Sequence, residues 1–74
     1  MGTFGSNLRE ARMSRSMTQQ EMADHLGVTL RTYQNYESDS HAPSFEALVL
    51  ICQKLDVSSD HLLGLSDEAP SGGR

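Results

Sequence analysis

The chain has 74 residues, a net charge of −4 and one cysteine, Cys52, so it forms one small domain that no intramolecular disulfide can stabilise. The lone cysteine points to the reducing cytoplasm, and the sequence shows neither a signal-peptide pattern nor the roughly 20 apolar residues that span a membrane. The negative charge argues against a partner held mainly by bulk positive charge, but it is concentrated in residues 42–74, so residues 1–41 can still face a polyanion.

Apolar residues recur at helical spacing, and no strand-like alternation is sustained, which predicts an all-α protein. Ser6 can cap a first helix over residues 7–15. Thr18 opens a second helix with a capping box, in which the Thr18 hydroxyl accepts the backbone N–H of Glu21 and the Glu21 carboxylate reaches back. Gly27 is the expected left-handed end of this helix, because glycine takes that conformation without penalty.

A polar loop separates the third and fourth predicted helices. Thr29 caps the third helix, over about residues 30–38, and Ser44 caps the fourth, which ends near Leu55. Pro43 disfavours helix in the residue before it, so the segment between the two helices is a loop. The fourth helix has the strongest apolar stripe of the chain, and this spacing predicts that the stripe is buried. Its members are Phe45, Leu48, Ile51, Cys52 and Leu55.

A short fifth helix and a tail complete the chain. Ser58 caps the fifth helix, which ends at Gly64. Residues 66–74 are polar and contain Pro, Gly and Ser, which predicts a flexible C-terminal tail. The predicted fold is therefore an all-α, compact five-helix bundle over residues 1–65.

The joint between the second and third helices, residues 27–29, is very short. Such a joint forces a sharp angle, as in the helix-turn-helix, whose second helix enters the major groove of DNA. Tyr33 and Tyr36 share one face of the third helix, and we expect that face to be buried. The helical wheel then turns four polar residues outward: Arg31, Gln34, Asn35 and Ser38. Arg and Asn are side chains that pair with guanine and adenine edges.

From Leu8 to Gly64 the sequence resembles the phage-repressor and Cro (Xre-type) family of helix-turn-helix regulators. The resemblance is carried jointly by the segments "LREAR", "MTQQEMADHLGVT", "YQNYE", "PSFEALVLICQKLDVS" and "DHLLG". It implies a lambda-repressor-like DNA-binding domain of prokaryotic or phage type. It further implies a sequence-specific transcriptional regulator, a repressor, that binds a double-stranded DNA operator as a homodimer in the cytoplasm.

The resemblance also implies roles for individual residues. The residues expected to read base edges are Thr29, Leu30, Arg31, Gln34 and Asn35. Those expected to contact DNA phosphates are Thr18, Gln19, Thr32, Ser40, His41 and Ser44. Arg12 and Glu37 match an ion pair that joins the first and third helices. The fifth helix is expected to supply the dimer contact, through Ser59, His61 and Leu62. The alternative is that this helix only closes the core, which Leu62 or Leu63 must face.

Two features depart from the family pattern. Leu30 stands where the family often has a polar residue, so it is limited to a thymine methyl or the sugar edge. Asp39 stands where the family has glycine, and Asp tolerates the left-handed conformation less well. The loop Asp39-Ser40-His41 also lacks the usual Lys or Arg, and His41 is only partly charged near neutral pH. These changes predict either weaker DNA binding than is usual for the family or binding that depends more on pH.

Several alternatives stay open at this point. The polar face of the third helix can be a merely solvated surface, and the same scaffold can serve as a protein-interaction module or as an antitoxin-like regulator with a protein partner. Arg9 and Arg15 can form a basic stripe for phosphates, or neither can meet DNA. The three histidines lack metal-ligand spacing and Cys52 lies on an apolar stripe, so we expect no metal, no cofactor and no enzyme activity.

Overall fold

The computed structural model describes residues 2–65, and this part of the chain forms five helices with no strand. Their bounds are α1 Phe4–Ser14, α2 Gln19–Leu26, α3 Leu30–Glu37, α4 Phe45–Leu55 and α5 Ser59–Leu63. The predicted all-α, five-helix fold is confirmed. The tail predicted for residues 66–74 lies outside the described residues. Among the helices described, none is long and apolar enough to cross a membrane.

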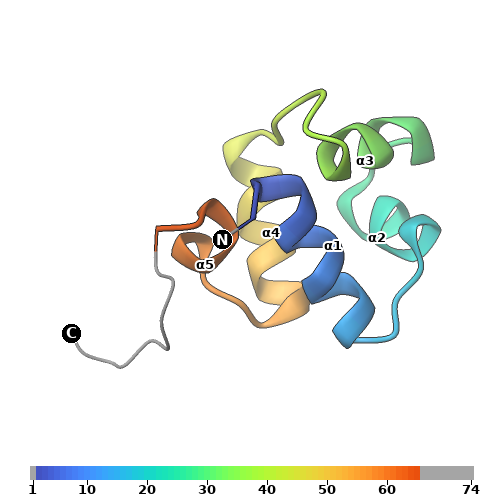
Figure 1. Ribbon diagram of the computed structural model, residues 1–74. Helices are drawn as coiled ribbons and strands as arrows, with labels where there is room; N and C mark the ends of the chain where they lie inside the picture. Colours follow the sequence, from blue (N-terminus) through green and yellow to red (C-terminus); the bar gives the residue numbers. More distant parts are fainter. Residues whose placement is uncertain (1, 66–74) are drawn as a thin grey trace.

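In Figure 1, α1 and α4 lie in the middle of the molecule, with α2 and α3 on one side and α5 on the other. Helix α1 packs against both α3 and α5, and α2 packs against α3 and α4. The α2–α3 pair therefore forms one end of the molecule, where it is supported from beneath by α1 and α4.

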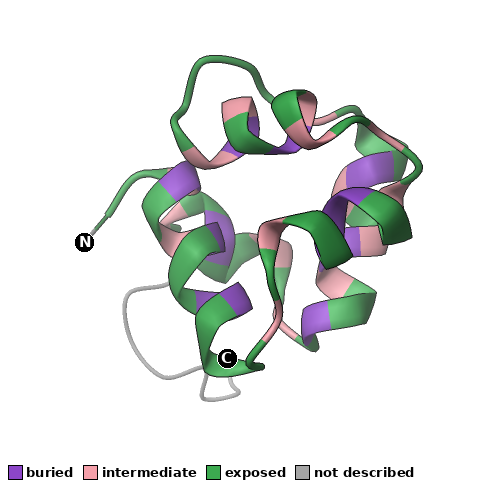
Figure 2. Cartoon of the chain, turned by 90° about the vertical axis from the view of Figure 1, so that its right-hand side faces the viewer, coloured by how far each residue is buried: buried purple, intermediate pink, exposed green. Residues whose placement is uncertain are grey.

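The hydrophobic core draws residues from every helix, and the buried positions turn toward the interior of the bundle (Figure 2). The buried cluster consists of Leu8, Ala11, Met22, Ala23, Tyr33, Tyr36, Ile51, Leu55 and Leu62. Because a domain of this size buries a limited area, each helix depends on the others for its stability.

The caps predicted for the second to fifth helices are present. The Thr18 hydroxyl accepts the backbone N–H of Glu21 at 3.0 Å, and the Glu21 carboxylate accepts the N–H of Thr18 at 2.8 Å, which completes the capping box. Gly27 ends α2 in the left-handed conformation, with φ at 72°. These local signals fix where the helices begin and end before any packing is considered.

The first helix begins earlier than the sequence predicted. Its N-cap is Thr3, whose hydroxyl oxygen accepts the N–H of Ser6 at 3.1 Å, so Ser6 lies inside the first turn. The extra turn is stabilised by tertiary contact, because Phe4 packs against the core. Both Thr3 and Ser6 are capping residues, and packing decides between them.

Gly5 and Asp39 hold the beginning of α1 against the end of α3. A Cβ atom on Gly5 would collide with the carbonyl oxygen of Glu37, so only glycine allows this approach. The N–H of Gly5 donates to Asp39 Oδ1 at 2.9 Å, and Asp39 has the left-handed φ of 65°. Asp39 therefore takes the left-handed turn at the position where the resemblance implies glycine, and it adds a bond between α1 and the α3–α4 loop.

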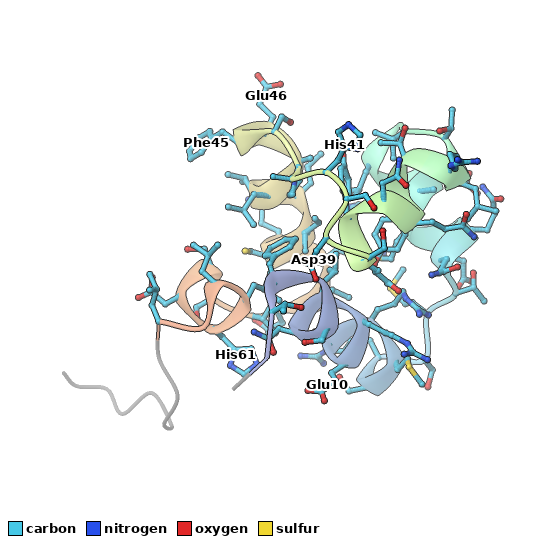
Figure 3. The ribbon with its side chains drawn as sticks, turned by 45° about the horizontal axis from the view of Figure 1, so that its top comes forward. Glu10, Asp39, His41, Phe45, Glu46 and His61 are labelled. Atoms are coloured by element: carbon cyan, nitrogen blue, oxygen red, sulfur yellow. The ribbon has the colours of Figure 1, made fainter. Side chains whose placement is uncertain are left out.

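The prediction that Phe45 is buried is wrong. Phe45 is the first residue of α4, its side chain is 79% exposed, and it projects away from the other helices (Figure 3). The buried residues of α4 follow a spacing of four through Ala47, Ile51 and Leu55. Phe45 lies one turn before the partly buried Leu48, which packs against the core, but as the first residue of α4 it lies at the end of the helix and outside the core.

Candidate nucleic-acid interface

The joint between α2 and α3 is held by local hydrogen bonds and by one apolar contact. The N–H of Val28 donates to the carbonyl of Ala23 at 3.0 Å, and the side chain of Val28 packs against the core. Thr29 then caps α3, because its hydroxyl oxygen accepts the N–H of Thr32 at 3.1 Å. Three ordered residues thus connect the two helices directly, as a helix-turn-helix requires.

One face of α3 is fixed in the core, and the opposite face is free. Tyr33 and Tyr36 are buried, with ring centroids 6.0 Å apart and planes at 75°, an edge-to-face contact. The outer face is formed by the exposed Arg31, Gln34 and Ser38 and the half-buried Asn35. Within residues 2–65, no hydrogen bond engages the side chains of Arg31 and Asn35, so both are available to a ligand.

An ion pair buried beneath α3 joins it to α1. Arg12 Nε donates to Glu37 Oε2 at 2.6 Å and Arg12 Nη2 to Glu37 Oε1 at 3.3 Å, while Arg12 Nη1 donates to the carbonyl of Met17 at 2.7 Å. The two side chains are only 10% and 5% exposed. The expected ion pair is therefore present, and the Met17 contact extends it to the segment that enters α2.

Two further side chains complete the hydrogen bonding of Glu37. The Tyr33 hydroxyl donates to Oε2 at 2.6 Å and Gln19 Nε2 donates to Oε1 at 3.0 Å. Gln34 Nε2 in turn donates to Gln19 Oε1 at 3.2 Å, so a chain of hydrogen bonds runs from the buried ion pair to the outer face of α3. We call Arg12, Gln19, Tyr33 and Glu37 the Glu37 cluster. Through Gln19, this cluster fixes the position of the Gln34 side chain.

The Glu37 cluster shifts the pKa of its members in opposite directions. Burial alone raises the pKa of Glu37, but hydrogen bonds from Arg12, Tyr33 and Gln19 outweigh it, so the pKa lies below the ordinary value of 4.5. Burial and the hydrogen bond to Glu37 raise the pKa of Tyr33 far above its usual range. Glu37 is therefore an anion and Tyr33 a neutral donor at neutral pH.

The lowered pKa of Glu37 predicts a loss of stability in acid. Above about pH 4.5 the Glu37 contribution is complete, and it is lost as the pH falls through the lowered pKa of the folded protein. Glu37→Gln cannot titrate, so the difference in free energy of unfolding between wild type and this variant should shrink from pH 7 to pH 3. Urea unfolding at several pH values measures that difference, in which the other carboxylates cancel. A difference that stays constant contradicts the assignment.

Of the residues expected to contact phosphate, Thr32 lies in α3, and the others lie at the beginning of α2, in the α3–α4 loop and at the N-cap of α4. Thr18 and Gln19 lie at the beginning of α2, and Ser44 caps α4. The carbonyl of Asn35 accepts the N–H groups of Ser40 and His41 at 3.0 and 3.2 Å, so the α3–α4 loop is tied directly to α3. Figure 3 shows His41 in this loop.

Two of the residues expected to read bases or contact phosphate are hydrogen-bonded to each other. The Thr29 hydroxyl donates to the Thr32 hydroxyl at 3.0 Å while capping α3. Leu30, between these two along the chain, is half-buried. Thr29 therefore has a structural task besides any contact with DNA, whereas Arg31 and Asn35 have no such bond among the described residues.

Leu62 was expected in the dimer contact, and this expectation is wrong. Its side chain is 0% exposed and belongs to the core, so it has no surface to offer to a partner. Asn7 Nδ2 donates to the carbonyl of Leu62 at 3.1 Å and helps to hold α5 against α1. His61 is exposed and Ser59 half-buried. The exposed apolar neighbours are Leu63 and Leu65, which are not among the residues expected in the dimer contact.

An open groove runs beside α3, between α1, the beginning of α2 and α3. It is lined by Arg9, Arg12, Met17, Thr18, Gln19, Gln34, Glu37 and Ser38. Thus two residues expected to contact phosphate, Thr18 and Gln19, and one expected to read bases, Gln34, share one concave surface. The expected dimer residues of α5 lie on the other side of α1 (Figure 1).

Two capped helices at a tight left-handed joint, with the second presenting a free polar face, define a helix-turn-helix domain. The chain belongs to the helix-turn-helix family of the Xre type, whose sequence pattern it matches over residues 8–62.

Proteins similar in sequence to this chain are named as transcriptional regulators or repressors. One is the uncharacterized HTH-type transcriptional regulator YqaE of Bacillus subtilis, 46% identical over 66 residues, or 88% of this chain and 57% of the relative. Another is the cryptic phage CTXphi transcriptional repressor RstR of Vibrio cholerae, 40% identical over 57 residues, or 77% of this chain and 51% of the relative. The chain therefore spans about half the length of these relatives.

The fold also resembles a solved structure, that of the P22 c2 repressor protein in complex with a synthetic operator. The TM-score is 0.79 and the identity 24%, with 85% of this chain and 96% of the other covered. This likeness establishes the arrangement of the helices.

Proposed function

We propose that this chain is the DNA-binding domain of a sequence-specific transcriptional regulator, a repressor, that reads operator DNA in the major groove with α3. The observation that carries the proposal is the outer face of α3. There the side chains of Arg31 and Asn35 make no hydrogen bond within residues 2–65, while the opposite face is fixed by Tyr33, Tyr36 and the Glu37 cluster. A rigid helix with free Arg and Asn side chains suits direct reading of bases.

The proposed contacts divide into base reading and phosphate binding. Arg31 suits a guanine edge, Asn35 an adenine edge, and Leu30 a thymine methyl. Gln34 and Thr29 are further candidates for base contact. Polar groups in α3 and in the neighbouring segments fix the register on the phosphates, namely Thr18, Gln19, Thr32, Ser40, His41 and Ser44. No step of this function needs a cofactor or a catalytic group.

The repressor is proposed to act in the cytoplasm as a homodimer. His61 and Ser59 of α5 remain candidate contacts, joined by the apolar side chains of Leu63 and Leu65. Phe45 projects on the same side of the molecule as α5 (Figure 3), so a second copy is the occupant that would cover these apolar groups. A two-fold dimer would place its two α3 helices in half-sites about 10 base pairs apart.

Binding to random double-stranded DNA at rising salt tests the proposal. A regulator binds at low salt and loses that binding steeply, because each phosphate contact releases counterions. A protein-interaction module on the same scaffold does not bind DNA at any salt concentration. An antitoxin-like regulator binds DNA and, in addition, a protein. Selection of sites from random duplexes then gives the operator sequence and the spacing of its half-sites.

Asn35→Ala should relax the preference for one base pair in each half-site, at a cost of about 1–3 kcal/mol in binding to the selected operator. The reason is that a bidentate contact to adenine is lost while the phosphate contacts remain. Titration of a panel of operators with single base changes measures the effect. Gln53→Ala, which removes an exposed amide on α4, serves as the control. Equal weakening on every sequence would show that Asn35 touches only the DNA backbone.

A further inference from the structure

Two arginines near α1 are alike in sequence but differ in their surroundings. Arg15 Nε donates to the carbonyl of Leu55 at 3.0 Å, and Arg15 Nη2 lies 3.6 Å from the Asp56 carboxylate. These bonds direct the Arg15 guanidinium to the C-terminal end of α4. Arg15 therefore ties α1 to α4 and lies outside the groove beside α3.

Arg9 lines the groove beside α3. Its side chain is exposed, and no hydrogen bond or ion pair engages its guanidinium within residues 2–65. The other charged side chains of the groove, Arg12 and Glu37, neutralise each other in a buried pair. Glu10, the next residue on α1, projects away from α3 (Figure 3). The charge that this groove offers to solvent is therefore that of Arg9.

We propose that Arg9 binds a DNA phosphate in this groove, an inference that rests on the function proposed above. Thr18 and Gln19, which also line the groove, supply a hydroxyl and an amide to the same strand. The α3–α4 loop, with Asp39, lacks a lysine or arginine for the backbone on its side. Arg9 supplies from α1 the positive charge that this loop does not provide, so a domain of net charge −4 can still hold a polyanion.

The matched pair Arg9→Gln and Arg15→Gln tests this contact, because both variants change the net charge equally. Affinity for random duplex DNA is measured from 50 to 200 mM salt, and the slope of log affinity against log salt is compared. Arg9→Gln should make the slope shallower by about 0.9. The difference in affinity between this variant and the wild type should therefore narrow about threefold over this range. Arg9→Lys should restore the slope, since lysine also neutralises a phosphate.

Arg15→Gln should leave the slope at the wild-type value and lower only the melting temperature, because its bonds are internal. Arg9→Gln should melt like the wild type. An unchanged slope in Arg9→Gln, or an equal change in both variants, overturns the phosphate contact while leaving the proposed function intact. If the wild-type protein itself shows no salt-dependent binding, the proposed function fails and this inference fails with it.

Discussion

Replacing Arg12 with methionine should lower the free energy of unfolding by about 3 kcal/mol. The substitution strands Glu37, whose side chain is only 5% exposed, and loss of one partner from a buried pair costs about 3–5 kcal/mol. Tyr33 and Gln19 still donate to the carboxylate, which places the effect at the lower end. For a domain of this size the melting temperature should fall by about 12 °C or more.

A double-mutant cycle separates the ion pair from its packing. Methionine keeps the apolar stem that Arg12 lays along the core, so the change removes mainly charge and hydrogen bonds. Glu37→Gln keeps an acceptor for Tyr33, and the double variant Arg12→Met, Glu37→Gln leaves no unpaired charge. The double variant should therefore be more stable than the sum of the single losses predicts. Additive losses would mean that the two groups do not interact.

The effect of Arg12 should extend to DNA binding. Hydrogen bonds run from Arg12 through Glu37 and Gln19 to Gln34 on the outer face of α3. When the buried end of this chain is lost, Gln34 and the groove lose their support from below. Binding measured well below the melting temperature of the variant should thus weaken although Arg12 itself is buried.

Much of this fold is encoded in local signals. The capping box at Thr18, the left-handed Gly27 and the caps at Thr29, Ser44 and Ser58 all appear where the sequence predicted them. Such signals act within one or two turns of the chain, so they can be read without knowledge of tertiary structure.

The errors fall where packing between distant segments decides. Thr3 replaces Ser6 as the first cap because Phe4 finds a place on the core. Phe45 is exposed because the buried face of α4 runs through Ala47 instead. The close approach of Gly5 to Glu37 joins residues more than 30 positions apart, which no local pattern encodes.

In the candidate site, too, local sequence predicts some features, and contacts between distant segments decide the others. Arg31 and Gln34 point outward, as predicted from the burial of Tyr33 and Tyr36, since one buried face of a helix determines the opposite one. The choice between Arg9 and Arg15 stayed open in the sequence, because three-residue spacing drifts around the helix and does not show which arginine faces the groove. The Leu55 carbonyl, which Arg15 reaches through the tertiary fold, distinguishes them.

Substitutions at Leu62 and Leu63 should distinguish the contribution of α5 to folding from its contribution to dimerisation. Leu62→Ala removes a fully buried side chain, and we expect a loss of about 2–5 kcal/mol in the free energy of unfolding at any protein concentration. Leu63 is 49% exposed, so Leu63→Ala should change the stability of the monomer by less than about 0.5 kcal/mol. Urea unfolding at low protein concentration measures both.

Sedimentation equilibrium of the same two variants supplies the second readout. Leu63→Ala should weaken self-association, because it removes apolar area from the surface that a second copy is proposed to cover. Leu62→Ala, studied where it remains folded, should associate like the wild type, since its side chain does not reach that surface. Loss of self-association in Leu62→Ala with unchanged unfolding would instead place Leu62 in the interface and require α5 to turn when the dimer forms.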